Sequence, residues 1–82
     1  MNTPEASISA LMMSIASSAA MAMGLAPHPE NGEVKQDKVM ARFNIDLLLV
    51  LQEKTLGNLT TDENPFLTNV ISDLQMRFLE LK

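Results

Sequence analysis

The stretch from Ala6 to Pro27 carries no charged side chain, and this constrains the fold of the 82-residue chain more than any other feature. Most of its residues are alanine, serine or methionine, with a few larger aliphatic side chains between them. A helix formed by this stretch lacks the charged face that a surface helix normally turns towards water. The stretch must therefore be covered by the rest of the chain, by another subunit or by a membrane.

An uncharged N-terminal segment can be a signal peptide or a membrane span. The triplet Ala20-Met21-Ala22 resembles a signal-peptidase site, but the residues before Ala6 lack the positive charge that a signal peptide needs. The segment reaches the length of about 20 residues that crosses a bilayer. However, it is rich in serine and poor in strongly apolar residues, and it has no flanking basic or aromatic anchors. We expect a cytoplasmic protein, with membrane association through this helix as an alternative.

The length of the chain favours an oligomer. A single domain of this size buries only about 60% of its unfolded surface when it folds alone, which leaves a monomer marginally stable. The chain has no cysteine, so disulfides cannot compensate, and this fits a reducing compartment. We therefore expect the core to be completed by other copies of the chain, in a dimer or a larger homo-oligomer.

The charge of the chain argues against binding to nucleic acid. Six basic and ten acidic residues give a formal net charge of −4, and the basic residues are scattered between Lys35 and Lys82. Proteins that bind phosphate backbones concentrate lysine and arginine on one surface. We expect no nucleic-acid partner.

The first helix is expected over about residues 4–24. Thr3 would be the N-cap, Pro4 the first helical residue and Gly24 the C-terminal stop. At 3.6 residues per turn, one face is lined by larger apolar residues, namely Ile8, Leu11, Met12, Ile15, Ala19, Ala22 and Met23. The opposite face is lined by small residues, namely Ala6, Ala10, Ser14, Ser17, Ala20 and Gly24. Because small residues let another helix approach closely, the second face is the expected subunit interface.

A connector over residues 25–36, which contains prolines and an Asn31-Gly32 turn, precedes a second helix over about 37–56. Asp37 is the expected N-cap of that helix. Its main apolar face is expected to be buried and holds Val39, Met40, Phe43, Leu47, Val50 and Leu51. A second apolar stripe, on the other side of Arg42, Asp46 and Glu53, holds Ile45, Leu49 and Leu56. Two apolar faces on one helix indicate contact with a second subunit.

The third helix is expected to begin at Thr60 or Pro65 and to end near Leu81. Thr60 and Glu63 have the spacing of a capping box, but Pro65 would interrupt a helix that began at Thr60. We therefore expect one turn over 60–63 and a kink or restart at Pro65. The buried face would hold Leu67, Val70, Ile71, Leu74, Phe78 and Leu81.

From about Ser9 onwards the chain resembles bacterial domain-of-unknown-function family 1844, a family of short helical proteins. The matching blocks are residues 14–19, 24–33, 45–48, 51–55 with 57–60, and 73–78. The resemblance implies a bacterial origin and a helical fold, and it brings no activity with it. Family members tend to carry charges near positions 49 and 56, where this chain has leucines.

No set of residues in the sequence indicates catalysis or metal binding. His28 stands alone between two prolines, and the Ser17-Ser18 pair has no neighbouring base. Methionines, including the Met12-Met13 pair, are expected to fill the core instead of binding copper. The carboxylates that could in principle form an acid–base pair are expected on a solvated surface, and they are Asp46, Glu53, Asp62, Glu63 and Asp73.

These observations predict a single all-α domain over residues 1–82, a three-helix bundle completed by oligomerisation. The expected function is that of a non-enzymatic interaction or scaffold protein without cofactor or metal, with a protein partner as a further option. Two alternatives stay open, a membrane-associated protein and a helical oligomer that binds a small apolar ligand or cofactor. The expected interface residues are Ala6, Ala10, Ser14, Ser17, Ile45, Leu49 and Leu56.

Overall fold

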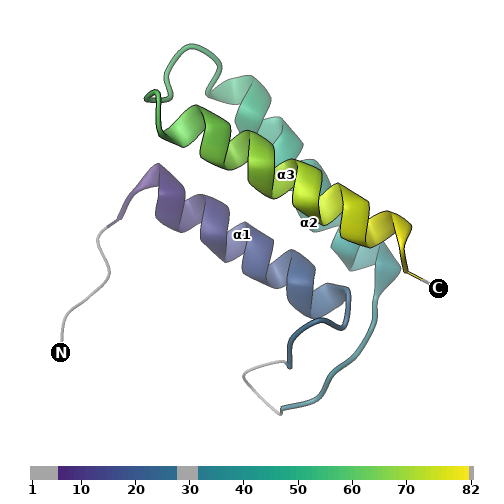
Figure 1. The fold of residues 1–82 in the computed structure, drawn as a ribbon. Coiled ribbons are helices and arrows are strands. Elements are labelled where there is room, and N and C mark those ends of the chain that lie inside the picture. Colours follow the sequence, from purple (N-terminus) through teal and green to yellow (C-terminus); the bar gives the residue numbers. More distant parts are fainter. Residues whose placement is uncertain (1–5, 28–31, 82) are drawn as a thin grey trace, which may run out of the picture.

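The computed structural model describes residues 6–27 and 32–81, and it contains three helices and no strand within those ranges. The helices are α1 (Ile8–Ala22), α2 (Lys38–Lys54) and α3 (Glu63–Leu79), and each contacts the other two. In Figure 1, α1 and α3 run along the front of the molecule and α2 lies behind them. The prediction of a small all-α bundle is confirmed.

Helix α1 begins later than predicted, at Ile8 instead of residue 4. Ser7 is in the extended conformation, and its hydroxyl oxygen accepts a hydrogen bond of 3.0 Å from the backbone N–H of Ala10. A serine in this position is a good N-cap because it pairs one of the free N–H groups at the helix start. The predicted cap residues Thr3 and Pro4 lie outside the described residues.

The C-terminus of α1 is the expected glycine stop. Gly24 has φ +78°, a left-handed backbone conformation that residues other than glycine rarely adopt. Its N–H bonds to the carbonyl of Met21 and the N–H of Leu25 bonds to that of Ala20, both at 3.0 Å. These two bonds form a Schellman motif, which ends the helix and turns the chain away from it.

The start of α2 is tied to the end of α1. An antiparallel bridge joins Met23 to Gln36, and the N–H of Asp37 donates a 2.6 Å hydrogen bond to the carbonyl of Ala22. The carboxylate of Asp37 then accepts from the N–H of Met40 at 3.1 Å, which confirms it as the N-cap. The two ends of the connector are therefore fixed side by side, and this sets α2 against α1.

Helix α3 keeps its predicted capping box but does not break at Pro65. The N–H of Thr60 donates to the Glu63 carboxylate at 2.9 Å, and the N–H of Glu63 donates to the Thr60 hydroxyl at 3.0 Å. The helix then runs without interruption from Glu63, so the predicted restart at Pro65 is wrong. Pro65 is tolerated because it lies in the first turn, where a missing N–H costs little.

The core lies between the three helices. It consists of Met12, Ala19, Ala22, Met23, Ala41, Ile45, Leu48, Leu67, Ile71 and Leu74. The predicted buried face of the third helix is confirmed, since Val70, Phe78 and Leu81 also pack against this core. The predicted large-residue face of the first helix is confirmed except for Leu11, which is exposed.

The predicted buried face of the second helix is wrong for Val39, Met40, Phe43 and Val50, which are exposed, whereas Leu51 packs against the core. Helix α2 instead turns Ala41, Asn44, Ile45 and Leu48 inwards. Ala41 and the buried alanines of α1 are small, so the two helices can pack closely through this face. Asn44 is accepted there because its side-chain amide donates a 2.9 Å hydrogen bond to the carbonyl of Met40.

Candidate interaction surface

The outer surface of α2 carries an apolar row that residues 6–27 and 32–81 leave uncovered. Val39, Phe43 and Val50 are 79%, 51% and 50% exposed, and we call these three residues the α2 stripe. At 100° per residue, the middle of the stripe lies about 160° around the helix from Leu48, which is fully buried. The stripe therefore points away from the core, and its residues are those that the sequence pattern had assigned to the interior.

The two sides of the α2 stripe differ in chemistry. On one side lie the exposed charges of Arg42, Asp46 and Glu53, and the guanidinium of Arg42 is 4.0 Å from the Asp46 carboxylate. On the other side lie Met40, which is exposed, and Leu47, which is half-buried. A row of apolar side chains with one charged margin is typical of a helix that packs on a partner.

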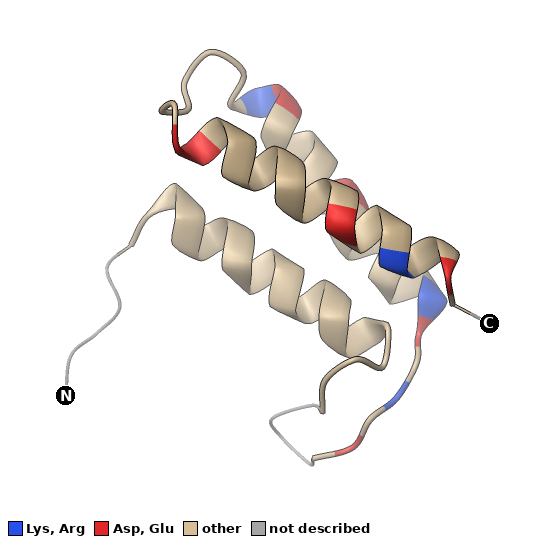
Figure 2. Cartoon of the chain, in the orientation of Figure 1, with Lys and Arg blue, Asp and Glu red and all other residues tan. Residues whose placement is uncertain are grey.

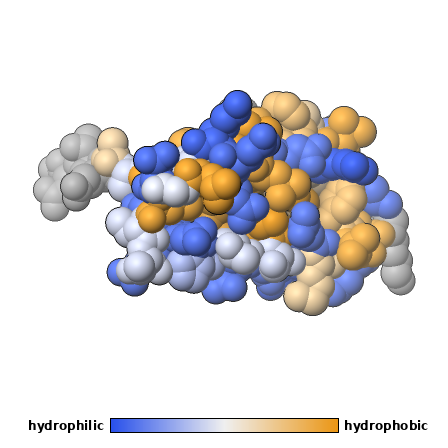
Figure 3. Space-filling model, turned by 90° about the horizontal axis from the view of Figure 1, so that it is seen from above, coloured by the Kyte–Doolittle hydropathy of each residue, from blue (hydrophilic) through white to orange (hydrophobic). Residues whose placement is uncertain are grey.

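A hollow occupies the N-terminal half of the stripe. It has a volume of about 330 Å³ and is lined by Lys38, Val39, Arg42, Phe43 and Asp46. Figure 3 shows the molecule from above, and on the face visible there apolar side chains gather between hydrophilic ones. Exposed apolar residues thus occur on more than one side of this small molecule, and those of α2 are aligned along one helix.

The outer face of α1 is uncharged, as Figure 2 shows. Of the residues predicted at the interface, Ala6, Ala10, Ser14 and Ser17 are exposed in the single chain. Leu11 and Met13 are exposed on the same helix. This surface is free to meet another helix, and its role as a subunit interface stays a prediction.

The predicted second stripe of the second helix does not exist as one surface. Ile45 is only 5% exposed and belongs to the core. Leu49 lies at the edge of a groove between α2 and α3, beside Phe78 and Leu79. Leu56 is 79% exposed and follows the end of α2, because the helix stops at Lys54, two residues earlier than expected. Of the predicted outer stripe, Ile45 is therefore buried, whereas Leu49 and Leu56 are exposed as expected.

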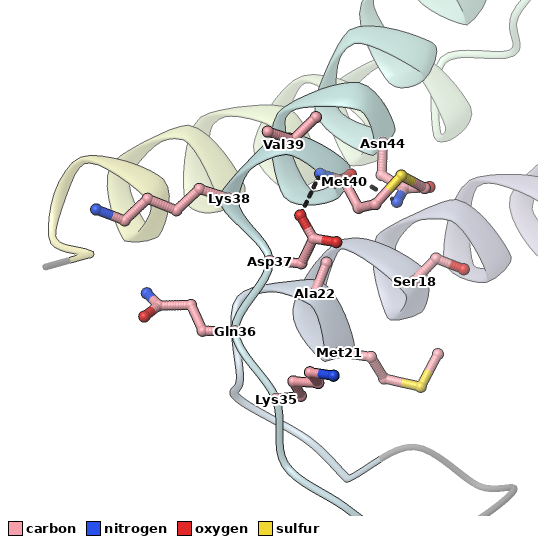
Figure 4. Close-up of a pocket in the computed structure, with 10 residues that line it drawn as sticks. All are labelled: Ser18, Met21, Ala22, Lys35, Gln36, Asp37, Lys38, Val39, Met40 and Asn44. Atoms are coloured by element: carbon pink, nitrogen blue, oxygen red, sulfur yellow. Dashed lines mark hydrogen bonds between the residues drawn. The ribbon is translucent and has the colours of Figure 1, made fainter.

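The ends of α1 and α2 enclose an open groove of about 620 Å³ (Figure 4). Met21, Val39 and Met40 supply much of its apolar surface. Two of its polar side chains are already engaged, because the Asp37 carboxylate caps α2 and the Asn44 amide bonds to the backbone. Lys35 and Lys38 line the rim and are exposed. The groove offers shape and apolar contact, without a pair of groups poised for acid–base chemistry.

Several other polar candidates from the sequence have structural partners. Ser18 donates its hydroxyl to the Ser14 carbonyl at 3.2 Å, and Arg77 binds Asp73 at 3.0 Å. Among residues 6–27 and 32–81, no three histidine or acidic side chains come together where they could hold a metal ion. Met12 and Met23 are buried, which confirms the core interpretation for these two, whereas Met13 is exposed. His28 lies outside the described residues.

Within the part of the chain that the structure describes, no helix has both the length and the apolar character required to span a bilayer.

The orientation of α2 is the feature that sequence reasoning missed. The sequence contains a signal for the correct orientation. Ala41, Asn44 and Leu48 are spaced three and four residues apart, so they lie on one face of the helix. A count of large apolar residues favoured the stripe instead. Close packing against the alanines of α1 selects the face with the small residue.

These features define an all-α protein with a three-helix core and an exposed apolar helix face. The chain matches the family described as Domain of unknown function (DUF1844) over residues 5–80, and it therefore belongs to this family. Comparison with curated proteins and with solved structures gave no match.

Proposed function

We propose that the protein is a non-enzymatic homo-oligomeric interaction or scaffold protein of the bacterial cytoplasm. The observation that carries this proposal is the α2 stripe, whose three apolar side chains are at least half exposed along one helix. A fully exposed side chain of this size gains about 1.5–3 kcal/mol on burial, and the part of each side chain that is still exposed would gain a corresponding fraction. A second protein surface would supply that burial.

The uncharged outer face of α1 supports the same proposal. It offers Ala10, Ser14 and Ser17, whose small side chains would let another helix approach closely. In a chain of only 82 residues, two such faces remain outside the core and are available for contact with other subunits. A scaffold of this kind would act through the proteins that it holds together, without chemistry of its own.

Light scattering on the purified full chain tests this proposal. The monomer mass is 9.0 kDa, and we expect a mass that is a multiple of this value at micromolar concentration. The apparent melting temperature should also rise with protein concentration, because association stabilises the folded chain by mass action. A folded species of 9.0 kDa over the whole concentration range would contradict the proposal.

The groove between α1 and α2 favours a second candidate, the binding of a small apolar molecule. Its volume of about 620 Å³ falls within the usual range of ligand pockets, and methionines adapt well to apolar ligands. Mass spectrometry of the protein isolated under native conditions would detect such a ligand. A spectrum with the bare protein mass alone would argue against this candidate.

A further inference from the structure

We propose that a second copy of this chain docks on the α2 stripe, with the two α2 helices antiparallel around a two-fold axis between Asp46 and Leu47. The inference rests on the proposed function, because it specifies which surface joins the subunits of the homo-oligomer. Three observations support it, namely the exposed stripe itself, its charged margin and its hollow.

The two-fold axis is placed where the stripe of one copy lies along the stripe of the other. Phe43 and Val50 are equally far from the midpoint between positions 46 and 47, and so are Val39 and Lys54. In a two-fold pair the same patch of both copies meets itself. Phe43 of each copy would then face Val50 of the other, and Val39 would pack against the aliphatic stem of Lys54.

The charged margin is complementary to itself in this arrangement. A two-fold axis perpendicular to the helices brings the same side of both helices together. Measured along the helices, Arg42 of one copy then lies about 3 Å from Glu53 of the other, given a rise of 1.5 Å per residue. The contact occurs twice. The two Asp46 carboxylates come near the axis, and each already has Arg42 of its own chain as a neighbour.

A parallel pair does not have this complementarity. In a parallel pair the two-fold axis runs along the helices, so the charged margin of each copy lies against the apolar margin of the other, and Arg42 faces the side of Met40 and Leu47 instead of Glu53. Charged groups placed beside apolar side chains lose hydration without gaining a partner. The charges on α2 therefore favour the antiparallel orientation.

The hollow beside Val39 and Phe43 gives the stripe a receiving site. Its lining residues centre on positions 42 and 43, which the proposed symmetry places opposite Val50 and Leu51 of the second copy. Val50 is half exposed, so its side chain is free to enter the hollow of the other chain. Contact with Val39 and Phe43 there would remove the exposed part of Val50 from water.

Cysteine cross-linking tests the position of the axis, and the native chain has no cysteine to interfere. At a usual interaxial distance, the two Asp46 Cα atoms come within about 6 Å of each other, inside the disulfide range. We expect Asp46→Cys to form a covalent dimer under mild oxidation. Asp73→Cys is the matched control, because Asp73, like Asp46, is exposed and pairs with an arginine one helical turn away.

The expected difference in rate is large. Paired thiols have an effective concentration in the millimolar range, so Asp46→Cys should cross-link roughly a thousandfold faster than the control in a micromolar solution. The register is checked with separate Phe43→Cys and Val50→Cys chains. Mixed together, the two variants should cross-link to each other. Each variant alone should not, because the two cysteines in a pair of identical chains lie about 10 Å apart along the helices.

Each outcome separates the inference from the proposed function. Equal cross-linking of Asp46→Cys and Asp73→Cys would show random collision and overturn the inference. An oligomer by light scattering in which Asp46→Cys does not cross-link would overturn the α2 interface and leave the oligomer intact. A chain of 9.0 kDa with no cross-links would overturn both.

Discussion

Replacing Leu48 with alanine is expected to lower the free energy of unfolding by about 2–5 kcal/mol. Leu48 is fully buried in the core between the helices, so its truncation removes apolar contacts and leaves a cavity. The total stability of a domain of this length is about 4–12 kcal/mol at the usual value per residue. Urea denaturation followed by far-UV circular dichroism, at one fixed protein concentration, measures the effect.

Leu79→Ala is the matched control for Leu48. It removes the same atoms from a leucine that is 83% exposed near the end of α3. The expected change is within about 0.5 kcal/mol, as for most surface substitutions. If both variants lost the same stability, Leu48 could not belong to the core, and the observed orientation of α2 would be wrong.

Replacing Ala19 with aspartate is expected to unfold the chain at neutral pH. Ala19 is fully buried on the inner face of α1, and no basic residue belongs to the core around it. A carboxylate in that position would lose its hydration without gaining a partner, which costs several kcal/mol. The loss of helical signal in circular dichroism would show the effect.

Ser17→Asp places the same charge on the exposed side of α1, two residues away. The Ser17→Asp chain should keep its helical content as a monomer, because the new carboxylate stays in water. A Ser17→Asp chain that unfolds like Ala19→Asp would contradict the described orientation of α1. A Ser17→Asp chain that stays helical but loses its oligomeric mass would place the outer face of α1 in the interface.

Local signals in the sequence predicted the helix ends well wherever a cap has a specific side chain. Asp37, Gly24 and the Thr60–Glu63 pair all act as their chemistry requires. Two boundaries were wrong for equally local reasons. Ser7 caps α1 later than the expected Thr3, and Pro65 is accepted within the first turn of α3.

The orientation of α2 could not be predicted by the same kind of reasoning. The sequence pattern indicates two apolar faces on this helix, but which of them is buried depends on how closely α1 approaches. Ala41 permits that approach, while Asn44 satisfies its amide within its own helix and so does not prevent burial. The choice is a property of the packing between two helices, and it decides which residues are left for a partner.

The sequence therefore indicated an exposed apolar surface on the second helix but assigned part of it to the wrong residues. An interface on the second helix was expected, but Ile45 lies in the core and the exposed row is Val39, Phe43 and Val50. The expected face on the first helix is exposed and uncharged. A surface for association is defined by what the core leaves uncovered, and so it becomes visible only once the core is known.

Sedimentation velocity on the chain with Val39→Ser, Phe43→Ser and Val50→Ser, compared with the native chain, tests the central claim most directly. The claim is that the α2 stripe holds two copies of the chain together. We expect the native chain to sediment as an oligomer and the triple variant as a folded, helical monomer of 9.0 kDa. A triple variant with the mass of the native oligomer, or a native chain that is itself monomeric, would contradict the claim.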